Sequence, residues 1–239
     1  MANRHTYEVQ KVQPTKASIE PCGPTGGKRG SCVLLHGWDA DGNSMKSICT
    51  VLHPLAAGWN LYVATYETHT ESFVDAARDL RPLVQPPQLA SPLILIGYSE
   101  GGVVARQMIA GGLPVSALVT ICTPHLGIGP WLPTPDLGSA SVSPFSPELK
   151  ALKDSAGEGA QRHLYHCFGI TCTDFSGNHP DDGVVPIQSA IAETLGAVAE
   201  QVTIPLDYNG YIAGWGPHLQ GMNPKRLQPV LNTCSTLFK

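Results

Sequence analysis

Short runs of apolar residues recur along the first half of the chain, and each is followed by a segment that suits a helix. Such runs, which lack alternating polar positions, are typical of strands that are buried on both faces of a sheet. The apolar runs cover 31–36, 61–66, 92–97 and 115–122, and the helices are expected over 43–57, 72–80 and 101–110. Alternation of strands and helices predicts βαβ units, and therefore a mostly parallel sheet with helices on both faces.

Two of the expected helices carry recognisable start and stop signals. Asn43 or Ser44 is expected to cap the first helix. Ser72 and Asp75 have the spacing of a capping box, and Pro82 is expected to end that helix near Leu80 because proline cannot donate a helical hydrogen bond.

The second half of the chain is less regular. Residues 126–147 are rich in proline, glycine and serine, and a helix is expected over 147–155. The alternation then resumes, with strands expected over 163–170 and 201–206 and helices over 187–195 and from about 224. A long irregular segment in a compact domain is usually functional. We therefore expect a single α/β domain over 1–239 with a cap-like or lid-like insertion at about 126–160, and a peripheral strand within Tyr7–Val12.

Composition and charge narrow the class of protein. Hydrophobic residues make up 42% of the 239 residues and charged residues 14%, which is typical of a globular domain. The net charge is −4 and no basic cluster is present, which argues against a nucleic-acid partner. No apolar stretch is long enough for an integral membrane segment. The first residues lack the apolar core of a secretory signal, which favours a cytoplasmic protein unless a signal has been removed.

The seven cysteines do not form a metal-binding or redox pattern. We expect free thiols in a reducing compartment, with a Cys167–Cys172 bridge left open as an alternative. The segment 39–43 superficially resembles a calcium loop but lacks the distal glutamate, so it is interpreted as a polar turn that caps the next helix. No metal site is predicted.

The pentapeptide Gly97-Tyr98-Ser99-Glu100-Gly101 fits the nucleophile-elbow pattern G-x-S-x-G. The serine of this pattern stands on a strained turn between a strand and a helix, where larger side chains at the glycine positions would clash with the backbone. The context agrees, because four apolar residues precede the pattern and a helical segment follows it. We therefore predict that Ser99 is a nucleophile.

A serine hydroxyl needs a base, and the base needs an orienting acid. In this type of fold, the acid and then the histidine follow the serine in the chain. His218 is the one histidine after residue 182, and it follows the last expected strand. Asp182 is the preferred acid, since it follows a strand and precedes Gly183, with Asp181 as the alternative. The aspartates that follow Ser99 in the chain are Asp136, Asp154, Asp174, Asp181, Asp182 and Asp207.

Two backbone amides are the expected oxyanion donors. The His36-Gly37-Trp38 step follows the first strand, and we assign the donors to the N–H groups of Trp38 and Glu100. His36 and His125 are interpreted as structural. Within the insertion, Trp131, Leu132 and Phe145 are predicted to bind substrate, the alternative being that they only pack the insertion onto the domain.

The pieces Leu34-Leu35-His36-Gly37-Trp38, 97–102, Thr123-Pro124-His125-Leu126-Gly127 and 181–186 resemble the small bacterial lipases and esterases of the α/β-hydrolase superfamily, in the same order along the chain. The resemblance implies an α/β-hydrolase fold and no cofactor. It also implies that the aspartate before Gly183-Val184-Val185, Asp182, is the acid of a catalytic triad.

The expected function is hydrolysis of carboxylic esters with short-to-medium acyl chains, on a small-molecule ester or lipid substrate. A thioesterase, amidase or acyltransferase that uses the same residues is the first alternative. A binding protein that has kept the fold without the activity is the second.

Overall fold

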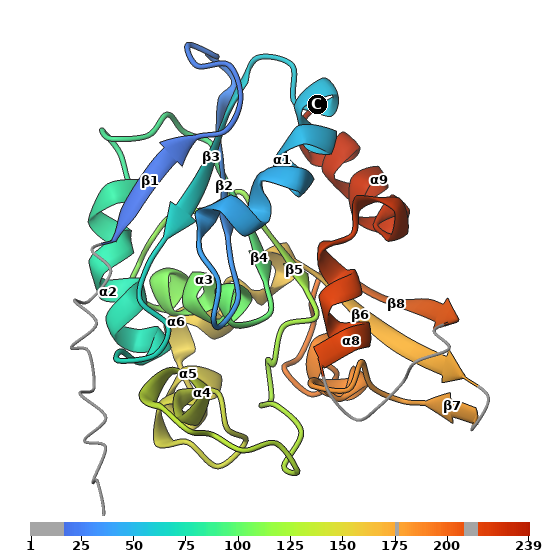
Figure 1. Cartoon of the computed structure of the whole chain (residues 1–239). Helices are drawn as coiled ribbons and strands as arrows, with labels where there is room; N and C mark the ends of the chain where they lie inside the picture. The colour runs from blue at the N-terminus through green and yellow to red at the C-terminus, as the bar shows by residue number, and fades with distance from the viewer. Residues whose placement is uncertain (1–16, 175–176, 208–214) are drawn as a thin grey trace, which may run out of the picture.

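The computed structural model describes residues 17–174, 177–207 and 215–239, and it arranges them around an eight-stranded sheet (Figure 1). The strands are β1 (Ser18–Pro21), β2 (Gly30–Leu35), β3 (Trp59–Thr65), β4 (Leu93–Tyr98), β5 (Ala117–Ile121), β6 (Tyr165–Asp174), β7 (Gly177–His179) and β8 (Glu200–Asp207). Their order across the sheet is β1-β3-β2-β4-β5-β6-β7, and β8 pairs with β6. The strand expected within Tyr7–Val12 lies outside the described residues.

The central pairings are parallel. β3, β2, β4, β5 and β6 follow one another with parallel registers, and β8 runs parallel to β6. β1 and β7 join antiparallel. In this register Leu35 lies beside Gly97, so the loops that follow β2 and β4 leave the sheet side by side. The predicted mostly parallel sheet is confirmed.

Helices cover both faces of the sheet (Figure 1). Leu93 and Leu95 of β4 belong to a core with α2 (Phe73–Val84) and α3 (Glu100–Ala110). Ile94 and Ile96 belong to a second core with α1 (Lys46–Leu52) and α9 (Gln228–Leu237). This arrangement explains why the strands read as continuous apolar runs. The helices are α1 (Lys46–Leu52), α2 (Phe73–Val84), α3 (Glu100–Ala110), α4 (Leu137–Ser141), α5 (Pro147–Lys153), α6 (Ala156–Gly159), α7 (Ile187–Ala190), α8 (Trp215–Leu219) and α9 (Gln228–Leu237).

Several helix boundaries differ from the prediction. α1 covers only Lys46–Leu52 of the expected 43–57, and α7 ends at Ala190 instead of residue 195. The capping box of Ser72 and Asp75 is present, but α2 continues past Pro82 to Val84. Val84 is buried in the same core as the rest of α2, and this packing keeps the last turn helical despite one lost hydrogen bond. Asp41, rather than Asn43 or Ser44, caps the turn before α1 by accepting from the Asn43 N–H.

The segment expected to be cap-like, at about 126–160, contains α4, α5 and α6. Leu149 and Leu152 of α5 are buried against the core formed with α2 and α3. A buried ion pair joins α6 to α3, with 2.7 Å between Arg106 Nε and Glu158 Oε1, and both side chains are fully buried. Because breaking such a pair leaves an uncompensated buried charge, it fixes α6 under the helix that follows Ser99.

The expectation that all cysteines are free is wrong. Cys22 and Cys49 form a disulfide that links the segment after β1 to α1. Cys167 and Cys172 are not joined to each other by a disulfide, so the bridge left open above does not form. A disulfide removes the reason to expect a reducing compartment. Within the described ranges, no helix combines the length and the hydropathy needed to cross a membrane.

Candidate active site

Ser99 occupies the turn between β4 and α3 with a strained backbone, at φ +52° and ψ −126°. Its N–H donates to the Ile121 carbonyl of the neighbouring strand at 2.8 Å, which holds the turn in place. A Cβ at Gly97 would lie 2.4 Å from Gly102, and one at Gly101 would lie 2.4 Å from the His36 carbonyl oxygen. The two glycines of the pattern are thus required by close backbone approach, as the sequence predicted.

The imidazole of His218, on α8, lies between Ser99 and Asp182. His218 Nε2 is 2.9 Å from Ser99 Oγ, and His218 Nδ1 is 2.7 Å from Asp182 Oδ2. The three residues are nearly inaccessible, with exposed fractions of 6% for Ser99, 1% for His218 and 0% for Asp182. The structure therefore brings the predicted serine, histidine and aspartate into one hydrogen-bonded chain.

The turn after β7 orients Asp182 and not Asp181 toward the imidazole. Oδ1 of Asp182 accepts hydrogen bonds from the N–H groups of Val184 and Val185, at 3.0 and 2.7 Å, which leaves Oδ2 for His218. The carboxylate of Asp181 accepts from the Gly183 N–H at 2.7 Å. Backbone donors on one oxygen fix the direction of the other, so the aspartate is held before any substrate arrives.

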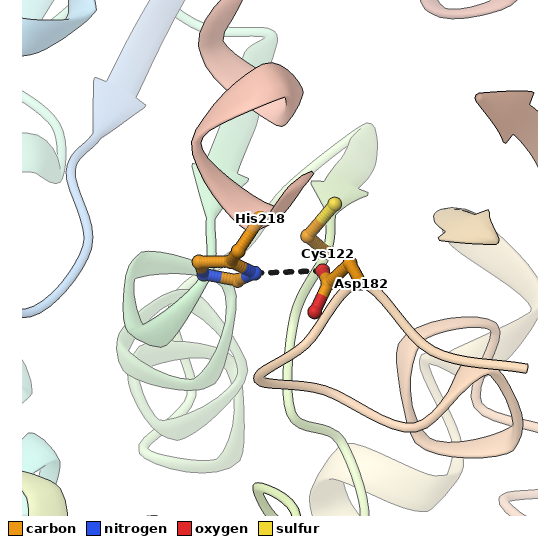
Figure 2. Close-up of side chains that lie close together, drawn as sticks. All are labelled: Cys122, Asp182 and His218. Carbon is orange, nitrogen blue, oxygen red and sulfur yellow. Dashed lines mark hydrogen bonds and ion pairs between the residues drawn. The ribbon is translucent and has the colours of Figure 1, made fainter. Parts of the chain in front are cut away.

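A third side chain, that of Cys122, lies beside Asp182 and His218 (Figure 2). The candidate ligand atoms of the three residues all lie within 4.8 Å of one another, a spacing that suits a metal ion. Both nitrogens of His218 already have hydrogen-bonding partners, however, and a metal would have to displace one of them. Burial raises the pKa of the Cys122 thiol well above its usual value, and the negative charge of Asp182 is the second cause of this rise. The thiol therefore stays neutral beside the aspartate.

His36 has a structural environment. Its Nδ1 lies 2.8 Å from the Gly37 carbonyl oxygen, its Nε2 accepts from the Tyr66 N–H, and its ring stacks on that of Tyr66. Burial lowers the pKa of His36 to about 4, so the ring is neutral and each nitrogen keeps one role. His125 is likewise buried, between Thr120 and Arg106.

Two cavities meet at Ser99. The smaller has a volume of about 110 Å³ and is largely apolar. The larger has a volume of about 740 Å³ and contains His218 together with several acidic side chains. The smaller cavity is lined by Trp38, Ser99, Glu100, Pro124, Ile128, Leu132, Pro133, Pro135, Ser139, Val142 and Val184. The larger is lined by Trp38, Asp39, Ala40, Asp41, Ser44, Tyr66, Glu67, Thr68, His69, Tyr98, Ser99, His218, Leu219 and Met222.

The residues predicted to bind substrate are divided by the structure. Leu132 lines the smaller cavity. Trp131 and Phe145 are not among the described residues that line either cavity at Ser99, and they are 52% and 84% exposed. Phe145 borders a separate hollow with Leu149. The alternation of exposed and buried positions in this irregular segment has no fixed period. The sequence therefore could not separate Leu132, which lines a cavity, from the exposed Trp131 and Phe145.

The two residues assigned as oxyanion donors flank Ser99. Glu100 is the first residue of α3, so its N–H lies at the N-terminus of that helix. Trp38 lines both cavities together with Ser99. His69 and Asp136 contact the Trp38 side chain from two other segments, a contact that the sequence did not predict, although Asp136 was among the candidate acids.

A mostly parallel sheet with helices on both faces and a strained serine after its central strand defines an α/β-hydrolase fold, and the resemblance inferred from the sequence is confirmed. The family model of the palmitoyl protein thioesterases matches residues 31–163, more than half of the chain. The chain belongs to this family.

Similar solved structures share the fold at low sequence identity. The mature form of the lipase BlEst2 from Bacillus licheniformis is 15% identical, with a TM-score of 0.61 over 94% of this chain and 99% of that one. The chain spans 54% of the propeptide form of that lipase. A structure reported with the carboxylesterases of Nitrososphaera gargenis has 14% identity and a TM-score of 0.56, covering 93% and 94%. The Vlm2 thioesterase domain has 14% identity and a TM-score of 0.51, covering 94% and 98%. A comparison with curated proteins found no match.

Proposed function

We propose that this protein hydrolyses carboxylic esters of short-to-medium acyl chains through a covalent acyl-enzyme, with Ser99, His218 and Asp182 as the catalytic residues. The observation that carries the proposal is the continuous hydrogen-bonded chain from Ser99 Oγ through both nitrogens of His218 to Asp182. With Nδ1–H donating to the aspartate, Nε2 is the acceptor for the serine proton.

The first half of the reaction acylates the serine. Ser99 Oγ attacks the ester carbonyl carbon while its proton moves to His218 Nε2, and Asp182 stabilises the imidazolium that forms. The oxyanion is held by the N–H groups of Trp38 and Glu100. Collapse of the tetrahedral intermediate breaks the bond to the alcohol oxygen, which leaves with the proton from His218. Water then attacks the acyl-enzyme with His218 as base, and the carboxylic acid is released.

The two cavities support an assignment of the two halves of the substrate. The apolar cavity of about 110 Å³ suits a short acyl group, because it is small beside the roughly 300–1,000 Å³ of most ligand pockets. The larger cleft of about 740 Å³, which contains His218, suits the alcohol that His218 must protonate.

The test is a series of p-nitrophenyl esters of increasing acyl length with the wild-type protein and Ser99→Ala. We expect the highest kcat/KM at short acyl chains and a loss of at least ~10³-fold in Ser99→Ala, with an unchanged circular dichroism spectrum. A fluorophosphonate probe should label the wild type and not the variant. Substantial turnover by folded Ser99→Ala would exclude this mechanism.

Thioester hydrolysis is the second candidate, and family membership together with the likeness to the Vlm2 thioesterase domain favours it. The same residues can cleave either bond, since only the leaving atom differs. Oxygen esters and thioesters, matched in acyl chain at each of several lengths and with leaving groups of similar pKa, would separate the two activities. A higher kcat/KM for thioesters at every chain length would replace the ester assignment, and an optimum at long chains would place the acyl group in the larger cleft.

A further inference from the structure

The small cavity beside Ser99 contains one buried acid. Glu100 lines this cavity although its side chain is almost completely inaccessible, with 2% exposed. Its Oε2 is buried and has no hydrogen-bonding partner among the described residues. A buried polar group without a hydrogen bond destabilises a fold. The presence of such a group in a largely apolar cavity therefore calls for a ligand that supplies the missing hydrogen bond.

We propose that Glu100 determines specificity in the acyl site, where its carboxyl group hydrogen-bonds an oxygen atom carried by the acyl chain a few atoms beyond the scissile carbonyl. The preferred substrates are then short oxygenated acyl esters, such as ether, keto or hydroxy acyl groups, rather than plain alkyl ones. This inference rests on the proposed function and deepens it.

The position of Glu100 supports this role. The residue follows Ser99 directly, so its side chain extends from the same turn that carries the nucleophile. The other lining residues include the apolar Ile128, Leu132 and Val184. The further polar side chains among the described lining residues are those of Trp38, Ser99 and Ser139, and the Trp38 indole already donates to Asp136. The Ser139 hydroxyl is already bound to Asp136 at 2.6 Å.

The protonation state agrees with the geometry. Burial raises the pKa of Glu100 to about 8, and the nearby negative charge of Asp136 is the second cause of this rise. At neutral pH the group is therefore mostly a neutral carboxylic acid, which can donate a hydrogen bond to an ether or carbonyl oxygen. A neutral acid also avoids placing a negative charge next to the developing oxyanion.

The test compares two p-nitrophenyl esters that differ by one atom, pentanoate and β-methoxypropanoate, in which oxygen replaces a methylene group. The readout is the ratio of their kcat/KM values, measured in the wild type, in Glu100→Gln and in Glu100→Met. We expect a preference for the methoxy ester of about tenfold in the wild type, because a site built to bond an oxygen discriminates against the analogue that lacks it. Gln keeps a donor and should keep most of the preference, whereas Met should lose it.

Equal ratios in all three proteins, with active hydrolysis, would overturn the inference and leave the ester hydrolase standing. Absence of hydrolysis together with no fluorophosphonate labelling of Ser99 would overturn the proposed function itself. If a variant does not fold, two phosphonate probes that carry the same alkyl and methoxyalkyl chains can be compared on the wild type alone. Faster labelling by the oxygenated probe supports the inference, and equal labelling rates contradict it.

Discussion

The indole nitrogen of Trp38 donates a hydrogen bond to the carboxylate of Asp136, with 3.1 Å from Nε1 to either carboxylate oxygen. Asp136 is the N-cap of α4, and it also lies 2.7 Å from His69 Nδ1. The segments that carry His69 and Asp136 thus meet the Trp38 loop, which we propose as one side of the oxyanion hole. This network orients the Trp38 loop relative to Ser99.

Removing the indole donor should therefore lower activity without unfolding the protein. We expect Trp38→Phe to reduce kcat/KM by about ten- to a hundredfold, because small misplacements of a catalytic group are costly to the rate. Trp131→Phe is the matched control, since Trp131 is exposed and outside both cavities, and its kcat/KM should stay at the wild-type value. Equal losses in the two variants would contradict this role for Trp38.

His69 makes the stability of this network depend on pH. The hydrogen bond to Asp136, and next that to Asp39, raises the pKa of His69 above its usual value of 6.5. A raised folded-state pKa contributes stability that is complete below the unfolded pKa and is lost as pH rises through the folded one. We therefore expect His69→Gln to lower Tm more at about pH 5.5 than at about pH 9. The same Tm decrease at both pH values would show that the charge of His69 does not matter.

Replacing either member of the Asp181-Asp182 pair tests which acid orients His218. Asp182→Asn should reduce kcat by about 10³- to 10⁴-fold, because an amide at this position favours the wrong imidazole tautomer. Asp181→Asn keeps an oxygen for the Gly183 N–H and should change kcat severalfold at most. Steady-state kinetics on one ester is sufficient, and a larger loss in Asp181→Asn would reverse the assignment.

Glu100 should make the fold less stable at alkaline pH. Its folded-state pKa of about 8 lies above the ordinary value of 4.5, so stability is greatest below about pH 4.5 and falls as pH rises toward 8. Above that pH the loss is complete. Glu100→Gln cannot ionise, and its Tm relative to the wild type should therefore be higher at about pH 9 than at about pH 5. A Tm difference independent of pH would mean that the carboxyl group is not held neutral by burial.

The Cys22–Cys49 disulfide should stabilise the fold. It closes a loop with a sequence separation of 27, for which the chain-entropy estimate is about 3.5 kcal/mol. Cys22→Ser should lower the free energy of unfolding by about this amount in urea titrations without reductant. Cys32→Ser, at a free buried cysteine, is a control that should respond to reductant as the wild type does. No effect of reductant on the wild-type midpoint would contradict the bridge.

Much of the fold was predictable because the strands in the middle of a parallel sheet are buried on both faces. Residues 93–96 are apolar at every position for this reason, and they identified both the sheet and the position of Ser99. The edge strand β1 was not predicted, since an edge strand needs no such run and its residues are half exposed. The end of α2 was placed too early, because burial of Val84 outweighs the proline two residues before it.

Residue types and their order along the chain were sufficient to propose Ser99, Asp182 and His218, since the chemistry needs a strained serine followed by an acid and a single later histidine. Only the tertiary structure decided that Trp131 and Phe145 lie outside the cavities and that Cys22 reaches Cys49. It also decided that Glu100 lines an apolar cavity with a carboxyl oxygen that has no hydrogen-bonding partner in the part of the chain that the structure describes. These features depend on contacts between segments that lie far apart in the chain. No periodic pattern in the sequence predicts such contacts, so the burial and pairing of these side chains are decided only when the segments pack together.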